Sequence, residues 1–317
     1  VEMFHDVKVR FENFTMSDTM PEEFPVPSKK LVDEFGQWMG KEWPGKVHSR
    51  EELKEKYQAL EGKAEYPFPE WNVWGGDKTR KLKEGTGFFS TCKTPDGRWH
   101  LTDPEGCDYF SLGPCGTRAG EWGRIDSFEN CCEWLPEEDA QYAEFFEEGS
   151  RRRTAYMPVD HYRMANFSGM NLKKIYGDDW KEKWEEISCH ILMNNGINSQ
   201  GNFPGIAVNN GRSKMAYVRE LPDFPVTDTL IFRDFPDVLS PEYEEKSRIY
   251  AEKLEEWKHD PWLIGYFLRN EPEFNFVENL AIADEVLRNP AQTFCRKGLI
   301  AFLKERYVTI EALNQAW

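Results

Sequence analysis

The sequence predicts an α/β protein in which strand–helix units build a parallel sheet. Over residues 106–317, short apolar runs and helical patterns alternate in the order strand, helix, strand, strand, helix, strand, helix. This alternation is typical of parallel sheets, because a helix carries the chain back to the start of the next strand. The apolar runs lie at 109–113, 197–203, 215–220 and 263–268.

A β-rich segment and a lead-in region are predicted before these units. Within residues 1–28, the stretch DVKVRFENFT alternates apolar and polar side chains, which indicates a strand at the end of a possible upstream β domain. Residues 29–105 are expected to hold a helix that begins after Ser49 and stops at Gly62. A hairpin should follow, because the turn sequences TPDGR and DPEGC separate short apolar runs.

Three helices are predicted among the strand–helix units. The DD pair at 178–179 is expected to cap the first helix, and Gly196 to end it. The SP pair at 240–241 should open the second helix, and the NP pair at 289–290 the third. Long connections after the first three strands, such as 114–176, are expected to be loops that build a site.

The composition limits the classes of function. The net charge of −16 argues against nucleic acid or an anionic membrane as a partner. No stretch approaches the roughly 18 apolar residues of a membrane span, and no signal peptide is visible. Aromatic residues make up 15% of the chain. Such rings line sugar-binding clefts, but they also fill large cores, and core packing is the expected role of most of them.

No metal, cofactor or disulfide framework is expected. The six histidines form no HxxxH or HExxH pattern, and the seven cysteines are irregularly spaced without a CxxC pair. Free thiols favour a reducing compartment such as the cytoplasm. This preference is weak, so the composition leaves the localisation of the protein open.

The apolar run LIGYFL at 263–268 stops abruptly at Arg269, Asn270 and Glu271. A continuous apolar strand is typical of a sheet that is buried on both faces. In a barrel of parallel strands, polar residues at the carboxyl end of a strand face the mouth of the active site. A charged loop after a strand is also commonplace. The position alone therefore leaves both a solvated loop and a catalytic group open.

The stretch DPWLIGYFLRNEPEF resembles the fourth strand of the large clan of retaining (β/α)8 glycosidases, which ends in an Asn-Glu pair. Other stretches resemble, in the same order, segments of the β-agarase family and of the related barrel-type β-galactosidases. Arg269 departs from the pattern, because an Asp is more usual there, and this puts the substrate contact at that position in doubt. The other matching stretches are FGQWMGKEWPGKV (35–47), DGRWHLTDPEGCDYFSLG (96–113), NNGINSQGNF (194–203), FRDFPDVLSPEYEEK (232–246) and RYVTIEALNQAW (306–317).

The resemblance implies a (β/α)8 TIM barrel and a glycoside hydrolase. The implied enzyme cleaves β-galactosidic bonds in an oligo- or polysaccharide by a retaining double displacement. Glu271 would be the general acid/base, and Asn270 would bind the 2-hydroxyl of the sugar. The resemblance also allows a periplasmic or secreted location.

Further sugar contacts are expected near these two residues. Asn198 and Asn202 are candidates, and turn formation explains them equally well. Phe203, which stands where a Trp is commoner in the family, or Trp122 could stack on a sugar face, although core packing is the simpler role of each ring. Glu273 is expected to support the catalytic carboxyl or to bind sugar.

The predicted elements amount to about half of a barrel. A complete barrel needs eight strands, and four strand–helix units are predicted here. The family's nucleophile, a Glu on the seventh strand, is therefore expected beyond Trp317, with a second chain or a further segment completing the barrel. Within the chain, Glu220 and Glu273 are the only candidates for that nucleophile. The competing interpretation is a non-catalytic carbohydrate-binding or scaffold protein derived from a barrel glycosidase.

Overall fold

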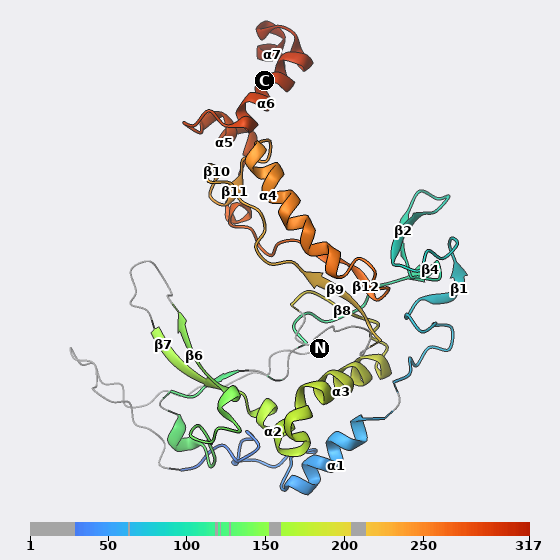
Figure 1. Ribbon diagram of the computed structural model, residues 1–317, viewed down its shortest axis with the longest axis vertical. Helices are drawn as coiled ribbons and strands as arrows, with labels where there is room; N and C mark the ends of the chain where they lie inside the picture. Colours follow the sequence, from blue (N-terminus) through green and yellow to red (C-terminus); the bar gives the residue numbers. More distant parts are fainter. Residues whose placement is uncertain are drawn as a thin grey trace, which may run out of the picture. The chain divides into compact units, whose positions relative to one another are not determined.

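The computed structural model describes residues 29–317 except 63, 118–119, 121, 127, 152–159 and 204–213 (Figure 1). The strand predicted within residues 1–28 lies outside the described residues. The described chain forms two compact units. The first consists of the residues up to Lys46 together with Trp122–Ser168, and the second of Val47–Glu121 and Gly169–Trp317.

The first unit holds a three-stranded antiparallel sheet in the order β5-β7-β6. Its strands are β5 (Gly123–Arg124), β6 (Phe146–Arg151) and β7 (Asp160–Ala165), with the short 3-10 helices η1 (Glu129–Cys131) and η2 (Ala143–Phe145) between β5 and β6. The prediction of a long loop over 114–176 was therefore wrong. β6 reads FEEGSR and has no apolar alternation, so the sequence pattern could not indicate a strand there.

The second unit begins with a helix and a four-stranded antiparallel sheet. Helix α1 (Arg50–Leu60) starts as predicted, because the hydroxyl of Ser49 accepts a hydrogen bond from the amide of Glu52 at 3.1 Å. It ends two residues before Gly62. The sheet has the order β1-β4-β3-β2 and confirms the predicted hairpin. Its strands are β1 (Asp77–Lys81), β2 (Ser90–Lys93), β3 (Trp99–Thr102) and β4 (Cys107–Tyr109).

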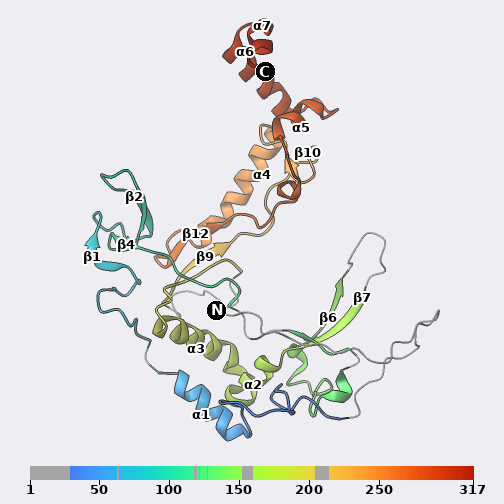
Figure 2. The same ribbon diagram turned by 180° about the vertical axis from the view of Figure 1, so that it is seen from behind.

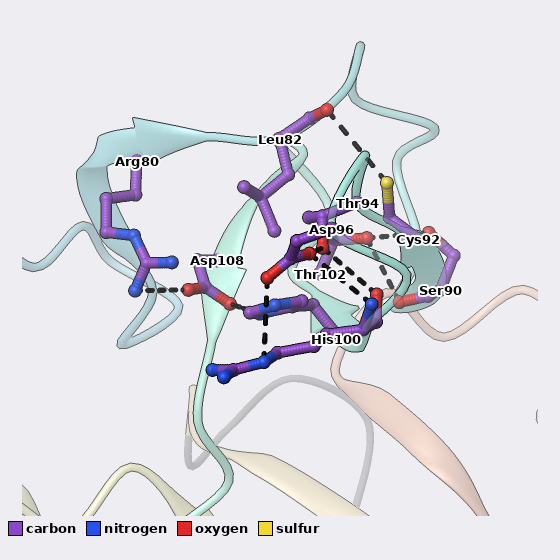
Figure 3. Close-up of polar contacts among 10 residues, drawn as sticks. Arg80, Leu82, Ser90, Cys92, Thr94, Asp96, His100, Thr102 and Asp108 are labelled. Atoms are coloured by element: carbon purple, nitrogen blue, oxygen red, sulfur yellow. Dashed lines mark hydrogen bonds and ion pairs between the residues drawn. The ribbon is translucent and has the colours of Figure 1, made fainter.

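Polar side chains tie the strands of this sheet together (Figure 3). The Asp108 carboxylate on β4 lies 3.0 Å from Nδ1 of His100 on β3 and 2.7 Å from the guanidinium of Arg80 on β1. The hydroxyls of Ser90 on β2 and Thr102 on β3 lie 3.1 Å apart. Each of the four strands therefore contributes a side chain that bonds to a neighbouring strand.

A parallel sheet forms the middle of the second unit (Figures 1 and 2). Its strands are β8 (Ser199–Gln200), β9 (Ala216–Glu220) and β12 (Leu263–Phe267), and β9 lies between the other two. The amide of Gly201 donates to the carbonyl of Pro114 at 2.8 Å, so the segment after β4 runs beside β8. The runs at 197–203, 215–220 and 263–268 thus supply neighbouring parallel strands in chain order, which confirms the α/β class with a parallel sheet. The predicted strand at 109–113 was wrong, because β4 ends at Tyr109 and pairs within the antiparallel sheet.

Helices and a short hairpin connect and follow these strands. The helices are α2 (Phe167–Tyr176), η3 (Gly177–Asp179), α3 (Trp180–Asn194), α4 (Pro241–Glu252), η4 (Lys253–Glu256), η5 (Glu273–Phe276), α5 (Ile282–Arg288), α6 (Phe294–Tyr307) and α7 (Ile310–Ala316). The antiparallel hairpin consists of β10 (Leu230–Phe232) and β11 (Phe235–Pro236).

One of the three predicted helix starts was wrong. Helix α3 begins at Trp180, directly after the DD pair at 178–179 as predicted, although Asp179 at the N-cap position makes no side-chain capping hydrogen bond. The third helix begins after Thr293, whose hydroxyl accepts the Arg296 amide at 3.2 Å, rather than at the NP pair. The start after Ser240 was also correct, since its hydroxyl caps α4 by accepting from the amide of Tyr243 at 3.0 Å. Gly196 follows α3 at a φ of 74°, as a helix-ending glycine should.

The two sheets of the second unit share a core. Phe89 and Tyr109 from the antiparallel sheet pack with Ala216 at the start of β9, and Ile264 of β12 packs against the same cluster. The Tyr109 hydroxyl also donates to the carbonyl of Asn198 at 2.9 Å. The antiparallel sheet therefore supports the amino ends of the parallel strands and leaves their carboxyl ends uncovered by this core.

Tyr217 should make the protein sensitive to alkaline pH. Its ring on β9 is fully buried, and its hydroxyl donates to the Asp260 carboxylate at 2.8 Å. Burial, followed by the hydrogen bond and charge of Asp260, raises the pKa of Tyr217. A group with a raised folded pKa gives stability that is present below its unfolded pKa of about 10 and is lost as pH rises above it.

We therefore expect Tyr217→Phe to lower the free energy of unfolding by about 1 kcal/mol at pH 8. The same substitution should also reduce the decrease in the free energy of unfolding that occurs as pH rises from about 10 to 11. Urea titrations across this range measure both effects. Tyr307→Phe is the control, because the pKa of this exposed phenol is lowered by the donating Trp317 and Arg306 side chains. A Tyr217→Phe protein whose stability falls above pH 10 as steeply as that of the unmodified chain would contradict the assignment.

Candidate functional site

The candidate site lies at the carboxyl ends of the three parallel strands, which meet at one edge of the sheet. Asn202 and Phe203 follow β8, and Glu220 is the last residue of β9. The register of the sheet places Phe267 of β12 opposite Glu220. Polar residues that follow Phe267 therefore extend beyond the same edge.

Asn270 and Glu271 lie four residues or fewer beyond the end of β12, and both are exposed. Glu271 has a φ of 41°, which side chains other than glycine rarely adopt. Such backbone conformations cost of order 1–3 kcal/mol and cluster at functional sites. The carboxyl of Glu271 is thus accessible and is presented by an unusual turn.

The side chain of Asn198 lies in the protein interior and bonds only to backbone groups. Its side-chain amide donates to the carbonyls of Gly75 and Phe110, each at 3.0 Å, and its carbonyl accepts from the amide of Leu112 at 2.8 Å. The residue is fully buried. This asparagine connects three segments of the chain, and both of its side-chain N–H donors are already used within the fold.

The side chain of Asn202 differs from that of Asn198 in having no hydrogen-bond partner among the described residues. Its side chain is 6% exposed, and neither its nitrogen nor its oxygen has a hydrogen-bond partner in the described part of the chain. Unpaired polar groups cost roughly 1–3 kcal/mol when they are buried, so this amide is suited to a ligand that can both donate and accept. The following Phe203 is 36% exposed at a φ of 57°.

The remaining predicted residues have simpler surroundings. Glu273 is exposed, and its backbone amide donates to the Asp234 carboxylate at 2.8 Å. Glu220 is half-buried at the end of β9. Trp122 is half-buried and belongs to the first unit.

Sequence reasoning missed two residues that hold the strand ends. Tyr250 on α4 reaches the carbonyls of Leu221 and Leu268, at 3.0 and 3.1 Å, just beyond β9 and β12. Asp234, in the turn between β10 and β11, forms an ion pair with Arg269. Neither contact leaves a local sequence signal, because the partners are between 18 and 35 residues apart.

Several other chemistries find no support among the described residues. No group of three or more His, Cys, Asp or Glu side chains in that part of the chain could hold a metal ion. All seven cysteines are free thiols. None of the helices in the described ranges is both long enough and apolar enough to cross a bilayer.

Comparison with known proteins relates this chain to enzymes that degrade polysaccharides. No protein-family model matches the sequence. β-Agarase B of Vibrio sp. (strain JT0107) is 26% identical over an alignment of 362 residues, which takes in 98% of this chain and 37% of the relative. The homologues of this chain are β-agarases.

Solved structures agree with this relation to the agarase homologues. An exo-β-agarase structure superimposes with a TM-score of 0.68 at 25% identity, covering 91% of this chain and 46% of that one. The structure of PfGH50B gives the same TM-score at 28% identity, over 91% of this chain and 45% of that one. The chain spans less than half the length of each of these three proteins. The similarity to agarases therefore covers nearly all of this chain and a part of each relative.

Proposed function

We propose that this chain belongs to a glycoside hydrolase that cleaves β-galactosidic bonds in agarose, with Glu271 as its general acid/base. The observation that carries the proposal is the exposed Asn270–Glu271 pair, which follows a parallel strand at the same sheet edge as the unpartnered amide of Asn202. Parallel strands in chain order support a (β/α)8 barrel as the parent fold. The agarase homologues suggest the substrate class.

The proposed mechanism is a double displacement with retention. In such enzymes two carboxyl groups about 5–5.5 Å apart flank the scissile bond. Glu271 would protonate the leaving oxygen while a second carboxylate attacks the anomeric carbon. Glu271 would then act as a base and activate the water that releases the sugar. Asn270 would bind the 2-hydroxyl, a hydrogen bond that strengthens as the ring approaches its oxocarbenium-like state.

Anomeric configuration gives the test of this function. The full-length protein is mixed with agaro-oligosaccharide, and proton NMR follows the first products before they mutarotate. The proposal expects the β-anomer to appear first, and a matched glucan should remain uncleaved. If the α-anomer appears first, the retaining mechanism is wrong. If the protein binds the oligosaccharide but releases no reducing ends, it is a carbohydrate-binding protein instead.

Asn202 should contribute to substrate binding rather than to folding. Replacing it with Ala removes a buried amide that has no partner in the described part of the chain, so the melting temperature should stay the same or rise. Loss of about 1.4 kcal/mol of hydrogen bonding would weaken the binding of an agaro-oligosaccharide about tenfold. Calorimetry and thermal melts of the full-length protein separate the two effects.

The control for Asn202 is Asn195→Ala. Asn195 is exposed after α3, and its amide donates to the carbonyl of Ile191 at 2.7 Å. This substitution should leave oligosaccharide affinity unchanged. An Asn202→Ala protein with unaltered affinity and a lower melting temperature would assign Asn202 to folding alone.

A further inference from the structure

The loop that carries Glu271 is held at both ends by one side chain, that of Asp234. Asp234 occupies the turn of the hairpin between β10 and β11. Its carboxylate forms an ion pair with Arg269, two residues before Glu271. The same carboxylate accepts the amide hydrogens of Glu273 at 2.8 Å and Phe274 at 3.0 Å. Glu271 thus lies midway between two points that are fixed to a single group.

Further contacts join the hairpin that carries Asp234 to the loop that carries Glu271. The backbone carbonyl of Asp234 accepts a second hydrogen bond from Arg269 at 3.3 Å. The guanidinium of the neighbouring Arg233 donates to the carbonyl of Glu273 at 3.1 Å. The rings of Phe235 and Phe274 meet edge to face with their centroids 5.1 Å apart. The hairpin and the loop are therefore joined by charge, by backbone hydrogen bonds and by ring packing.

The side chain of Arg269 is also enclosed by its neighbours. Its guanidinium lies 5.4 Å from the ring centroid of Phe224. The side chains of Arg269 and Asp234 are 23% and 17% exposed, so solvent screens this pair less than it screens pairs at the surface. Arg269 donates to Asp234 through two nitrogens, which restricts its orientation.

The backbone of Glu271 needs such support. A glutamate at a φ of 41° is strained, and conformations of this kind persist only where the surroundings impose them. The contacts of Asp234 to residues 269, 273 and 274 enclose the strained turn. Without them, the turn is free to relax and to move the carboxyl away from the strand end.

We propose that Asp234, acting through Arg269 and the amides of residues 273 and 274, positions the Glu271 carboxyl for proton transfer. The inference rests on the proposed function. It also explains why an Arg is compatible with this place, where an Asp is more usual in the resembling family. The Arg contacts the hairpin of its own chain through Asp234.

The test measures whether Asp234 acts through Glu271. In the full-length protein, Asp234→Ala should lower kcat on agaro-oligosaccharide by about 10- to 100-fold, since a displacement of about 1 Å can cost 10²-fold. KM should change less than threefold, roughly, because the sugar contacts remain. An aryl galactoside with a good leaving group should lose less, because its first step needs little protonation. The limb of the pH–rate profile that reports the acid/base should move.

A double-mutant cycle separates positioning from a merely structural role. If Asp234 acts through Glu271, then Asp234→Ala should reduce kcat no further in a protein that already carries Glu271→Gln. If the double mutant instead loses kcat by the product of the two single-mutant factors, the inference is overturned. Asp234→Asn, which keeps one acceptor oxygen and loses the charge, should fall between the unmodified protein and Asp234→Ala. It also serves if the alanine variant fails to fold. An Asp234→Asn protein with unchanged kcat and pH profile would refute the proposal.

The control is Asp228→Asn. Asp228 forms an ion pair with Lys246 at 3.4 Å near the same hairpin, and its hydrogen bonds go to Glu242 and Lys246 rather than to the loop. Its kinetics should match the unmodified protein. The two proposals fail differently: full activity of Glu271→Gln would refute the assignment of the acid/base. An inactive Glu271→Gln together with normal Asp234 variants would refute only the positioning role.

Discussion

Replacing Glu271 with Gln should leave the full-length protein folded and lower its turnover of agaro-oligosaccharides by about 10²–10⁴-fold. The fold should survive, because the exposed side chain keeps its size and the substitution lies beyond the end of β12. The loss is the usual contribution of general acid–base catalysis, since a glutamine cannot give a proton to the leaving oxygen. Initial rates from a reducing-end assay, with a melting curve for each protein, measure both quantities.

Two further measurements show which step Glu271 serves. Aryl galactosides with good leaving groups should lose less in the first step, since their departure needs little protonation. Added azide should restore the second step, because an anionic nucleophile needs no general base. Glu273→Gln is the matched control, because Glu273 lies two residues away on the same loop and is also exposed, and this substitution should lower turnover much less. Unchanged turnover of Glu271→Gln on a natural oligosaccharide would exclude the assignment, and Glu220 would then be tested.

Replacing Asn198 with Ala should destabilise the protein severely and leave little folded material for any assay. Three backbone groups, the carbonyls of Gly75 and Phe110 and the amide of Leu112, would lose their partners in the interior. An unsatisfied buried group costs about 1–3 kcal/mol, so the free energy of unfolding should fall by roughly 3–5 kcal/mol. Urea denaturation followed by circular dichroism measures the change.

The chain segments around Asn198 are packed too closely for a local rearrangement to give these three backbone groups new partners. A Cβ on Gly75 would lie 2.5 Å from that of Asn198, so the two segments are already in close contact. Asn195→Ala again serves as the control, since this exposed asparagine bonds only within its own helix end. A loss below about 1 kcal/mol for Asn198→Ala would show that water or a rearranged backbone satisfies the three groups.

Local chemistry made part of the fold predictable. Ser49 and Ser240 each precede a helix whose first turn offers free amides, and a hydroxyl at that position bonds to them in almost any context. The apolar run at 263–268 forms the strand β12 as predicted, but its residues are only half-buried and the strand lies at one side of the three-stranded sheet, so the expected burial on both faces is not seen in the described chain. These signals depend on neighbours within a few residues.

Other parts of the fold depend on partners that are distant in sequence. The NP pair at 289–290 ends α5, because the Asn289 side chain donates to the carbonyls of Leu230 and Ile231. A tertiary contact thus overrides the helix start that local rules favour at the NP pair.

The candidate site likewise combines features that follow from local sequence with features that depend on the fold. The position of Asn270–Glu271 after a strand could be read from the sequence, and the structure puts it there. The different surroundings of Asn198 and Asn202 could not, because both are asparagines of one short run. Only the fold reveals that Asn198 precedes β8 with its side chain bonded to three backbone groups, and that the side chain of Asn202, after β8, has no hydrogen-bond partner in the described part of the chain.

The hydroxyl of Tyr250 has one proton and two acceptors. It lies 3.0 Å from the carbonyl of Leu221 and 3.1 Å from that of Leu268, so at any moment it can donate fully to only one of them. Burial, with the charges of Asp223 and Glu220, raises the pKa of Tyr250 and keeps the proton in place. Because a hydroxyl reorients on the picosecond-to-nanosecond scale, β9 and β12 exchange this bond far faster than a catalytic turnover. The two strand ends should therefore keep their spacing while each remains free to make small movements along its own axis.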